Sequence, residues 1–186
     1  MTLRISRDHS LLLVIDIQAR LAPHIDGHER LIRLTDVLLD AAALFGIPKV
    51  LTEHCPQQIG PVIEPMRSRF AAGEIFEKTA FGATDHPQFV QVLRERGRRQ
   101  VIVTGMEAHV CVLQAALGLR ELGFEVIVVE DAVGSRAVRR HDLELALRRM
   151  AQAGCVIAGA ETVLYEWTGS AVDPRFRDVL RIVKAL

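Results

Sequence analysis

The sequence has no long apolar run. Its longest uninterrupted apolar stretches, such as residues 11–15 and 41–45, are far shorter than the roughly 18 to 20 residues that a membrane-spanning helix needs. The run that stops at Asp16 is also too short for the core of a signal peptide, and no small-residue cleavage site follows it. We therefore expect a soluble protein without a signal peptide, located in the cytoplasm.

Cysteines and aromatic residues are also scarce. The three cysteines, Cys55, Cys111 and Cys155, are an odd number at irregular spacing, which fits neither a disulfide framework nor paired Cys-x-x-Cys zinc sites. Aromatic residues make up 5% of the chain, whereas hydrophobic residues make up 49%. The core is therefore expected to consist mainly of aliphatic side chains, as it commonly does in layered α/β proteins.

Neither sign of charge is in excess. The 23 basic and 23 acidic side chains cancel, so no excess positive charge is available to hold nucleic acid or an anionic membrane. The glycine-rich phosphate loops G-x-G-x-x-G and G-x-x-x-x-G-K-[ST] are missing as well. The expected partner is therefore a small-molecule substrate, and we expect no nucleic acid and no membrane partner.

Short β-rich runs alternate with longer segments of helical periodicity, which predicts βα units on a parallel sheet covered by helices on both faces. We expect one α/β domain over residues 1–186, with three α/β/α layers. The expected strands are 11–16, 49–53, 74–76, 100–104, 125–129 and 155–158. The expected helices are 29–45, 87–96, 109–122, 140–152, 160–167 and 173–186, and glycines at positions 46, 97, 123 and 154 end four of them.

Parallel sheets of this kind bind ligands at the carboxyl ends of their strands, and three reactive side chains follow strands there. Asp16 ends the first strand, Lys78 lies just past the third, and Cys111 lies in the first turn of the helix after the fourth. The positive end of a helix dipole favours a thiolate. Each residue also has an ordinary alternative: a capping carboxylate, a solvated surface lysine and a small buried hydrophobe.

Several segments around these residues carry a resemblance to a known family. They are DIQ at 16–18, EKTAF at 77–81, GMEAHVCVLQAALGL at 105–119 and VVEDAVGSR at 128–136, together with residues 52–60. They resemble the isochorismatase-like cysteine hydrolase superfamily, and the segment 52–60 is similar to that of its isochorismatase-domain-containing subgroup. The resemblance covers nearly the whole chain. It implies a doubly wound, six-stranded parallel sheet of Rossmann type and assembly into a homo-oligomer.

The resemblance also implies an Asp-Lys-Cys catalytic triad. Cys111 is expected to be the nucleophile, Asp16 the base that takes its proton, and Lys78 the cation that stabilises the thiolate. The implied reaction is amidase-type hydrolysis of a small amide or related carbonyl compound through a Cys thioester. The resemblance places the oxyanion hole at the backbone N–H groups of Glu107 and Cys111, with a cis peptide joining Met106 to Glu107.

Four further side chains, Gln18, His54, Phe81 and His109, are expected to line the substrate pocket. His54 follows the second strand and His109 lies beside the proposed nucleophile, so each is placed to hydrogen-bond a substrate. Capping or packing is an equally good interpretation of each histidine.

The chain departs from two members of the superfamily. Nicotinamidases carry an Asp-x-His-x-x-His metal site after the second strand, but the corresponding residues 51–58 contain His54 and no second histidine three residues later. We therefore expect no metal and no other cofactor. Isochorismatases proper generally have glycine where this chain has Cys111, so the name of the superfamily is a poor guide to this reaction.

A second hypothesis comes from a different class of protein. The chain is then a non-catalytic or redox-responsive binding protein that retains the hydrolase scaffold, with Cys111 reacting with oxidants instead of with an amide. The complete set of three triad residues favours the hydrolase.

Overall fold

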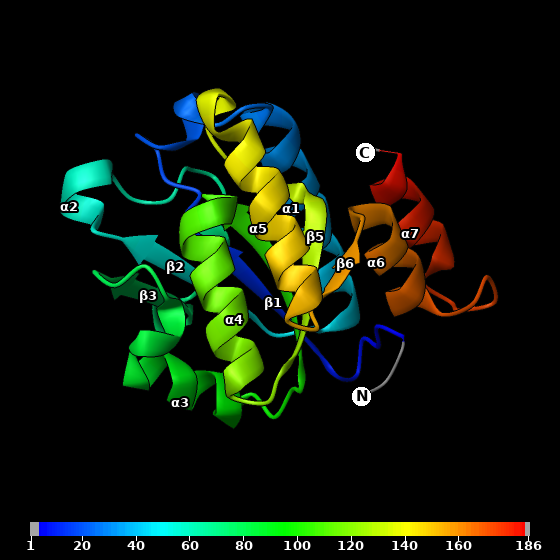
Figure 1. The fold of residues 1–186 in the computed structure, drawn as a ribbon. Coiled ribbons are helices and arrows are strands. Elements are labelled where there is room, and N and C mark those ends of the chain that lie inside the picture. The colour runs from blue at the N-terminus through cyan, green and yellow to red at the C-terminus, as the bar shows by residue number, and fades with distance from the viewer. Residues whose placement is uncertain (1–3, 185–186) are drawn as a thin grey trace.

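The computed structural model describes residues 4–184, in which strands and helices alternate along the chain (Figure 1). The strands are β1 (Ser10–Ile15), β2 (Lys49–His54), β3 (Ile75–Lys78), β4 (Gln100–Met106), β5 (Glu125–Gly134) and β6 (Val156–Ala158). The α-helices are α1 (His28–Phe45), α2 (Pro56–Ile59), α3 (Pro87–Glu95), α4 (Leu113–Glu121), α5 (Arg140–Gln152), α6 (Ala160–Thr168) and α7 (Phe176–Val183). A π-helical turn, Ala108–Val112, precedes α4.

The six strands form one parallel sheet in the order β3-β2-β1-β4-β5-β6. Strands β1, β2 and β3 therefore follow one another toward one edge of the sheet. Strand β4 lies on the other side of β1, and β5 and β6 follow it toward the opposite edge. This is the doubly wound, Rossmann-type sheet that the sequence predicts. The strand order reverses between β1 and β4, where Ile15 lies beside Gly105.

Helices cover both faces of the sheet. On one face α4 and α5 lie side by side, as Figure 1 shows in front of the strands, and α3 packs on the same apolar layer. Helices α1 and α6 pack on the opposite layer. Strand β1 contributes to both layers, because Leu12 and Val14 point to one side and Leu11 and Leu13 to the other. Burial on both faces explains why this strand is continuously apolar.

All six predicted strands are found, with differences at some ends. Strand β5 continues to Gly134, five residues beyond its expected end, because the chain stays extended past Glu130 and Asp131. The charges at these two positions end the apolar run from which the end of the strand was predicted. The strand continues through them because the Glu130 side chain is exposed to solvent and no charge is buried there.

The predicted helices are also found, and two of them differ in form. The helix expected over 109–122 begins as the π turn before continuing as α4. The terminal helix expected over 173–186 is shorter, because α7 spans Phe176–Val183, and residues 185–186 lie outside the described residues. The short helix α2 was not expected.

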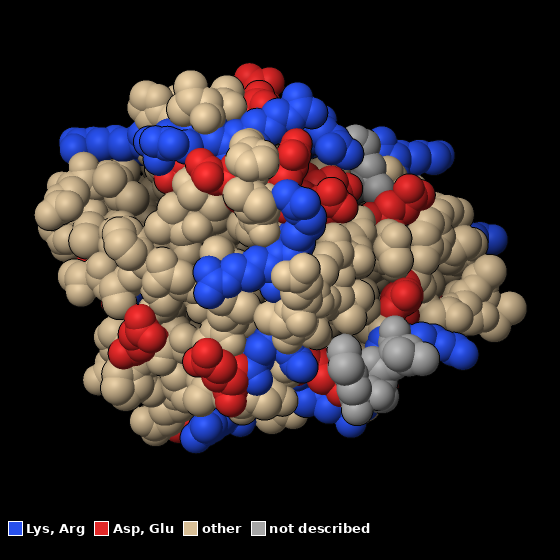
Figure 2. All heavy atoms as spheres, viewed as in Figure 1, with Lys and Arg blue, Asp and Glu red and all other residues tan. Residues whose placement is uncertain are grey.

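The surface agrees with the balanced composition. Figure 2 shows acidic and basic side chains interspersed over the viewed face, without a continuous field of one sign. Among residues 4–184, no helix combines the length and the apolar character needed to span a bilayer.

Candidate active site

The three predicted catalytic residues meet near the point where the strand order reverses. Asp16 directly follows β1, Cys111 lies in the π turn that follows β4, and Lys78 is the last residue of β3. Asp16 has a φ of 51°, a left-handed conformation that is uncommon for a residue with a side chain. Such conformations are concentrated at functional sites, where the surrounding structure holds them in place.

Asp16 and Lys78 form a buried ion pair. The distance from Lys78 Nζ to Asp16 Oδ2 is 2.7 Å, and the two side chains are only 2% and 1% exposed. The second carboxylate oxygen accepts a hydrogen bond of 2.7 Å from Thr52 Oγ1. The ammonium also donates to the carbonyl oxygens of Ala80 and Phe81, each at 3.4 Å. Both oxygens of the carboxylate therefore have partners, and Lys78 is not the solvated surface lysine of the alternative interpretation.

Cys111 is 6% exposed, and its environment favours the neutral thiol. Burial is the largest influence and the Asp16 carboxylate adds to it, so that the pKa of the Cys111 thiol is raised to about 12. Lys78 acts in the expected direction and lowers this pKa, but burial and Asp16 outweigh it. The surroundings of the Cys111 thiol therefore favour its neutral form, and Lys78 acts against this preference.

The π turn shapes the backbone around the thiol. The Glu107 carbonyl oxygen accepts hydrogen bonds from the N–H groups of Val110 and Val112, at 3.0 and 3.2 Å. A bond that spans five residues makes this first turn wider than an α-helical turn. The peptide between Met106 and Glu107 is cis, at the position that the resemblance implies.

A cavity of about 190 Å³ opens onto the thiol and the carboxylate. It is lined by Asp16, Leu21, His54, Ile59, Phe81, Glu107, Val110 and Cys111. Two of the three triad candidates thus face one small space, and Lys78 reaches Asp16 from β3. The proposed nucleophile and the proposed base therefore line the same cavity.

Of the four side chains expected to line the pocket, His54 and Phe81 do so. Their rings stack, with centroids 5.2 Å apart and planes inclined by 29°. They form a flat wall of the cavity.

Gln18 and His109 have other positions. Gln18 is buried, and its amide joins β2 to the following loop: it accepts from the His54 N–H at 2.7 Å and donates to the carbonyl oxygens of His54 and Gly60. His109 Nδ1 lies 2.8 Å from Ser135 Oγ, and its ring lines a neighbouring hollow beside Leu113. Neither residue is among those that line the cavity beside Cys111, and their pocket role stays a prediction.

Three residues of the cavity were not predicted from the sequence, and the side chain of Glu107 was not predicted to line it, although its backbone N–H was expected at the site. Leu21 lies in a turn and Ile59 ends the short helix α2, and in neither segment does a periodic pattern indicate the direction of a side chain. Val110 directly precedes the predicted nucleophile Cys111, and Glu107 was predicted through its backbone. Their nearness in sequence to the expected site was therefore the signal that could have identified both side chains. The Glu107 carboxylate is paired, because Arg136 Nε donates to its Oε1 at 2.8 Å.

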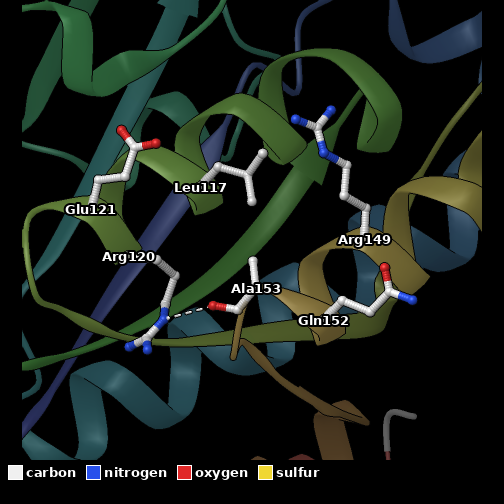
Figure 3. Close-up of a pocket in the computed structure, with 6 residues that line it drawn as sticks. All are labelled: Leu117, Arg120, Glu121, Arg149, Gln152 and Ala153. Carbon is white, nitrogen blue, oxygen red and sulfur yellow. Dashed lines mark hydrogen bonds between the residues drawn. The ribbon is translucent and has the colours of Figure 1, made fainter.

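A larger and more open groove of about 560 Å³ lies between the end of α4 and the end of α5 (Figure 3). The guanidinium of Arg120 in this groove already has hydrogen-bond partners within the chain, because it donates to the carbonyl oxygens of Ala153 (Figure 3) and Phe124. None of the triad candidates lies among the residues drawn there. Among residues 4–184, no group of three or more His, Cys, Asp or Glu side chains is placed to hold a metal ion.

Comparisons with known proteins identify relatives that match nearly the whole chain. "Isochorismatase family protein 2A" of Dictyostelium discoideum is 32% identical over 97% of this chain and 92% of its own length. "Isochorismatase domain-containing protein 1" of Danio rerio is 35% identical over 94% of this chain, which spans 61% of that longer protein.

Solved structures extend the comparison to the fold. A MAR1 ribonuclease from Caenorhabditis elegans has 34% identity and a TM-score of 0.89, covering 97% of this chain and 92% of that one. YcaC from Pseudomonas aeruginosa, solved with hexane-2,5-diol and covalent acrylamide, has 25% identity and a TM-score of 0.89, covering 98% and 92%. The model of the isochorismatase domain matches residues 10–162, and the chain therefore belongs to the isochorismatase family.

Proposed function

We propose that the protein is a cofactor-free cysteine hydrolase that cleaves the C–N bond of a small amide through a thioester on Cys111. The observation that carries this proposal is the shared cavity: the Cys111 thiol and the ion-paired Asp16 carboxylate face the same space of about 190 Å³. A nucleophile beside an oriented base is the arrangement that covalent acyl transfer requires.

In the first half of the reaction, Cys111 Sγ attacks the amide carbon while its proton passes to Asp16. Burial and the Asp16 carboxylate raise the pKa of the thiol, so the Asp16 carboxylate is needed to accept the proton as sulfur attacks. The Lys78 ammonium stabilises the negative charge that develops on sulfur. The backbone N–H groups of Glu107 and Cys111 are the proposed donors to the oxyanion. Collapse breaks the C–N bond, Asp16 returns the proton to nitrogen, and ammonia or an amine leaves.

In the second half, a water molecule attacks the thioester carbon. Asp16 takes a proton from this water, the C–S bond breaks, and the proton passes to the departing sulfur of Cys111. The products are a carboxylic acid and the original thiol, so one water is consumed and no oxidant, reductant or metal is required. The same carboxylate thus acts as base and acid in both halves.

The relatives support this chemistry unevenly. The covalent acrylamide in Pseudomonas aeruginosa YcaC supports the proposed size and neutrality of the ligand, but not C–N cleavage, because acrylamide is attacked at its alkene carbon and keeps its amide bond. The Caenorhabditis elegans relative is called a ribonuclease. A net charge of zero and a cavity of about 190 Å³, which is small for a nucleotide, disfavour that activity for this chain.

The test combines turnover with detection of the intermediate. Purified protein is incubated with a panel of small primary amides, ammonia release is followed, and acid-quenched samples are searched by mass spectrometry for an acyl group on the peptide that contains Cys111. Cys111→Ala and Cys111→Ser are expected to remove both signals while leaving the circular dichroism spectrum unchanged. Cys55→Ala is the matched control and keeps both signals.

Retention of wild-type turnover in Cys111→Ala would refute the thioester mechanism. If none of the amides releases ammonia or acylates the protein, while dilute peroxide oxidises Cys111 reversibly, the redox-responsive binding protein becomes the better account.

A further inference from the structure

We infer that the substrate is an uncharged amide with a short apolar acyl group, of roughly eight non-hydrogen atoms in all, and that charged amides are rejected. This inference rests on the proposed function, because it concerns the molecule that occupies the same cavity. It is drawn from the volume of the cavity, the chemistry of its wall and the pairing of the charged groups around it.

The volume limits the size of the substrate. Pockets for drug-sized ligands generally measure about 300 to 1,000 Å³, so the cavity of about 190 Å³ is small. An engineered apolar cavity of about 150 Å³ binds benzene, which has six non-hydrogen atoms. Scaling by volume gives roughly eight such atoms here, three of which belong to the amide group. About five atoms remain for the rest of the acyl chain.

The wall favours an apolar acyl group. Leu21, Ile59, Phe81 and Val110 supply four of the eight lining side chains. Phe81 stacks on His54, so that one side of the cavity is flat. Burial of each added methylene against such a wall is expected to raise kcat/KM by about fourfold until the cavity is full.

The charged groups at the cavity already have partners. Asp16 is paired with Lys78 at 2.7 Å and Glu107 with Arg136 at 2.8 Å. In the described part of the chain, no lysine or arginine lines the cavity. A carboxylate or an ammonium on the substrate would therefore lose its hydration without gaining a free opposite charge, which strongly disfavours binding.

The first experiment compares amides of matched shape. Propionamide is paired with glycinamide, in which an ammonium replaces the terminal methyl group, and isovaleramide is paired with malonamate, in which a carboxylate replaces the isopropyl group. We expect kcat/KM to be at least 100-fold higher for the uncharged member of each pair. It should rise from acetamide to butyramide and fall for octanamide, which exceeds the volume.

Two kinds of failure are distinguishable in this experiment. Hydrolysis of malonamate or glycinamide as efficiently as its uncharged partner would overturn the inference and leave the proposed function standing. If no amide is hydrolysed, recognition is measured alone, by calorimetric titration of Cys111→Ala with isovaleramide and malonamate. Equal affinity for both, or preference for malonamate, would overturn the inference independently of the chemistry.

The second experiment changes the charge of the cavity without changing its lining. Arg136→Met leaves the Glu107 carboxylate without its 2.8 Å partner, so an unpaired negative charge faces the cavity. The ratio of kcat/KM for glycinamide to that for propionamide is expected to rise at least tenfold. Arg139→Met is the matched control, because Arg139 pairs with Asp142. An unchanged ratio in Arg136→Met, or an equal rise in Arg139→Met, would contradict the assignment.

Discussion

At the scale of single residues, the Asp16 carboxylate has two opposed effects on Cys111. At rest its negative charge helps to raise the pKa of the thiol, and during the reaction it is the proposed acceptor of the thiol proton. Lys78 moderates the first effect through its own positive charge and orients the carboxylate for the second. Substitutions at these positions should therefore separate the reactivity of the thiol from turnover.

Replacement of Asp16 by asparagine is expected to make Cys111 easier to alkylate while abolishing hydrolysis. The substitution removes the negative charge that raises the thiol pKa and leaves the Lys78 charge, which lowers it, so the thiolate forms at lower pH. Turnover is lost because the amide accepts no proton from the thiol. The measurements are the rate of alkylation by iodoacetamide between pH 6 and 10, mapped to Cys111, and ammonia release from the best substrate.

The exposed Asp40, which contacts Arg69 on the surface, provides the control for that experiment. Asp40→Asn should leave both profiles at their wild-type positions. A shift of the Cys111 alkylation profile to higher pH in Asp16→Asn would mean that the carboxylate stabilises the thiolate, contrary to the electrostatics described above.

The buried ion pair also allows stability and catalysis to be separated. Lys78→Met leaves Asp16 as an unpaired buried charge and is expected to lower the free energy of unfolding by about 3 to 5 kcal/mol. The double variant Asp16→Asn/Lys78→Met contains no unpaired charge and should recover most of this loss. It should remain inactive, because the base is missing.

Urea denaturation and ammonia release measure these two properties side by side. A double variant with recovered activity would exclude Asp16 as the base, and one as unstable as Lys78→Met would show that the charge itself is not the source of the instability.

The sequence predicted that the three triad candidates lie close together better than it predicted which side chains line the cavity beside them. Asp16, Lys78 and Cys111 follow strand ends, and parallel strands bring such residues to one edge of a sheet. The positions of Gln18 and His109 depend on the direction of a side chain in an irregular segment or in a widened turn. Periodicity does not specify such directions, and neither residue is among those that line the cavity beside Cys111.

At the scale of the elements, the site depends on the close approach of β1 and β4 at the reversal of strand order. Gly105 of β4 lies beside Ile15, with a φ of 130°. A Cβ atom at this position would overlap the Ile15 carbonyl oxygen, which belongs to the rigid backbone just before Asp16. The glycine thus allows the two strands that carry the base and the nucleophile to lie next to one another.

Gly105→Ala is therefore expected to lower the free energy of unfolding by at least about 3 kcal/mol, through the steric overlap and the strained φ. Gly73→Ala is a matched control, because a Cβ there meets nothing within 4 Å. It should change stability by no more than about 0.5 kcal/mol. Thermal and urea denaturation of both variants measure the effect, and similar stabilities for the two would rule out the close approach.

The elements themselves were predictable wherever apolar spacing determined them. The continuous apolar run of β1 predicted a strand buried on both faces, and the observed β1 is such a strand. The π turn at Ala108–Val112 was not predictable, because the residues of a widened turn keep the apolar pattern of an ordinary helix start. The missed turn is the segment that carries Cys111.

At the scale of the whole molecule, we expect association between copies of the chain, as the family resemblance implies. Val138 and Leu145 on the face of α5 and the turn before it are 84% and 45% exposed, which leaves apolar surface for such contacts. Size-exclusion chromatography with light scattering should give a mass of at least twice the 20.7 kDa of one chain. A mass of one chain at concentrations well above the assay range would contradict this expectation.

The layer of core that α3, α4 and α5 cover contains two thiols, and we expect them to make the stability of the whole molecule sensitive to alkaline pH. Cys111 and Cys155 both belong to that layer, and burial raises the pKa of the first to about 12 and of the second to about 11. In an unfolded chain both thiols ionise near pH 9. Between these values the unfolded state binds fewer protons than the folded state, so stability falls as the pH rises.

The free energy of unfolding should accordingly decline from about pH 9 towards pH 11, with a slope of up to about 1.4 kcal/mol per pH unit for each thiol. The double variant Cys111→Ala/Cys155→Ala removes both groups and should show a shallower decline than the wild type over the same range. Val112→Ala is the control, since it removes apolar atoms from the same layer without removing a titratable group, and it should lower stability equally at every pH. Urea denaturation at pH 7, 9, 10 and 11 measures the slopes, and parallel declines in the wild type and the double variant would show that the buried thiols are not the source of alkaline sensitivity.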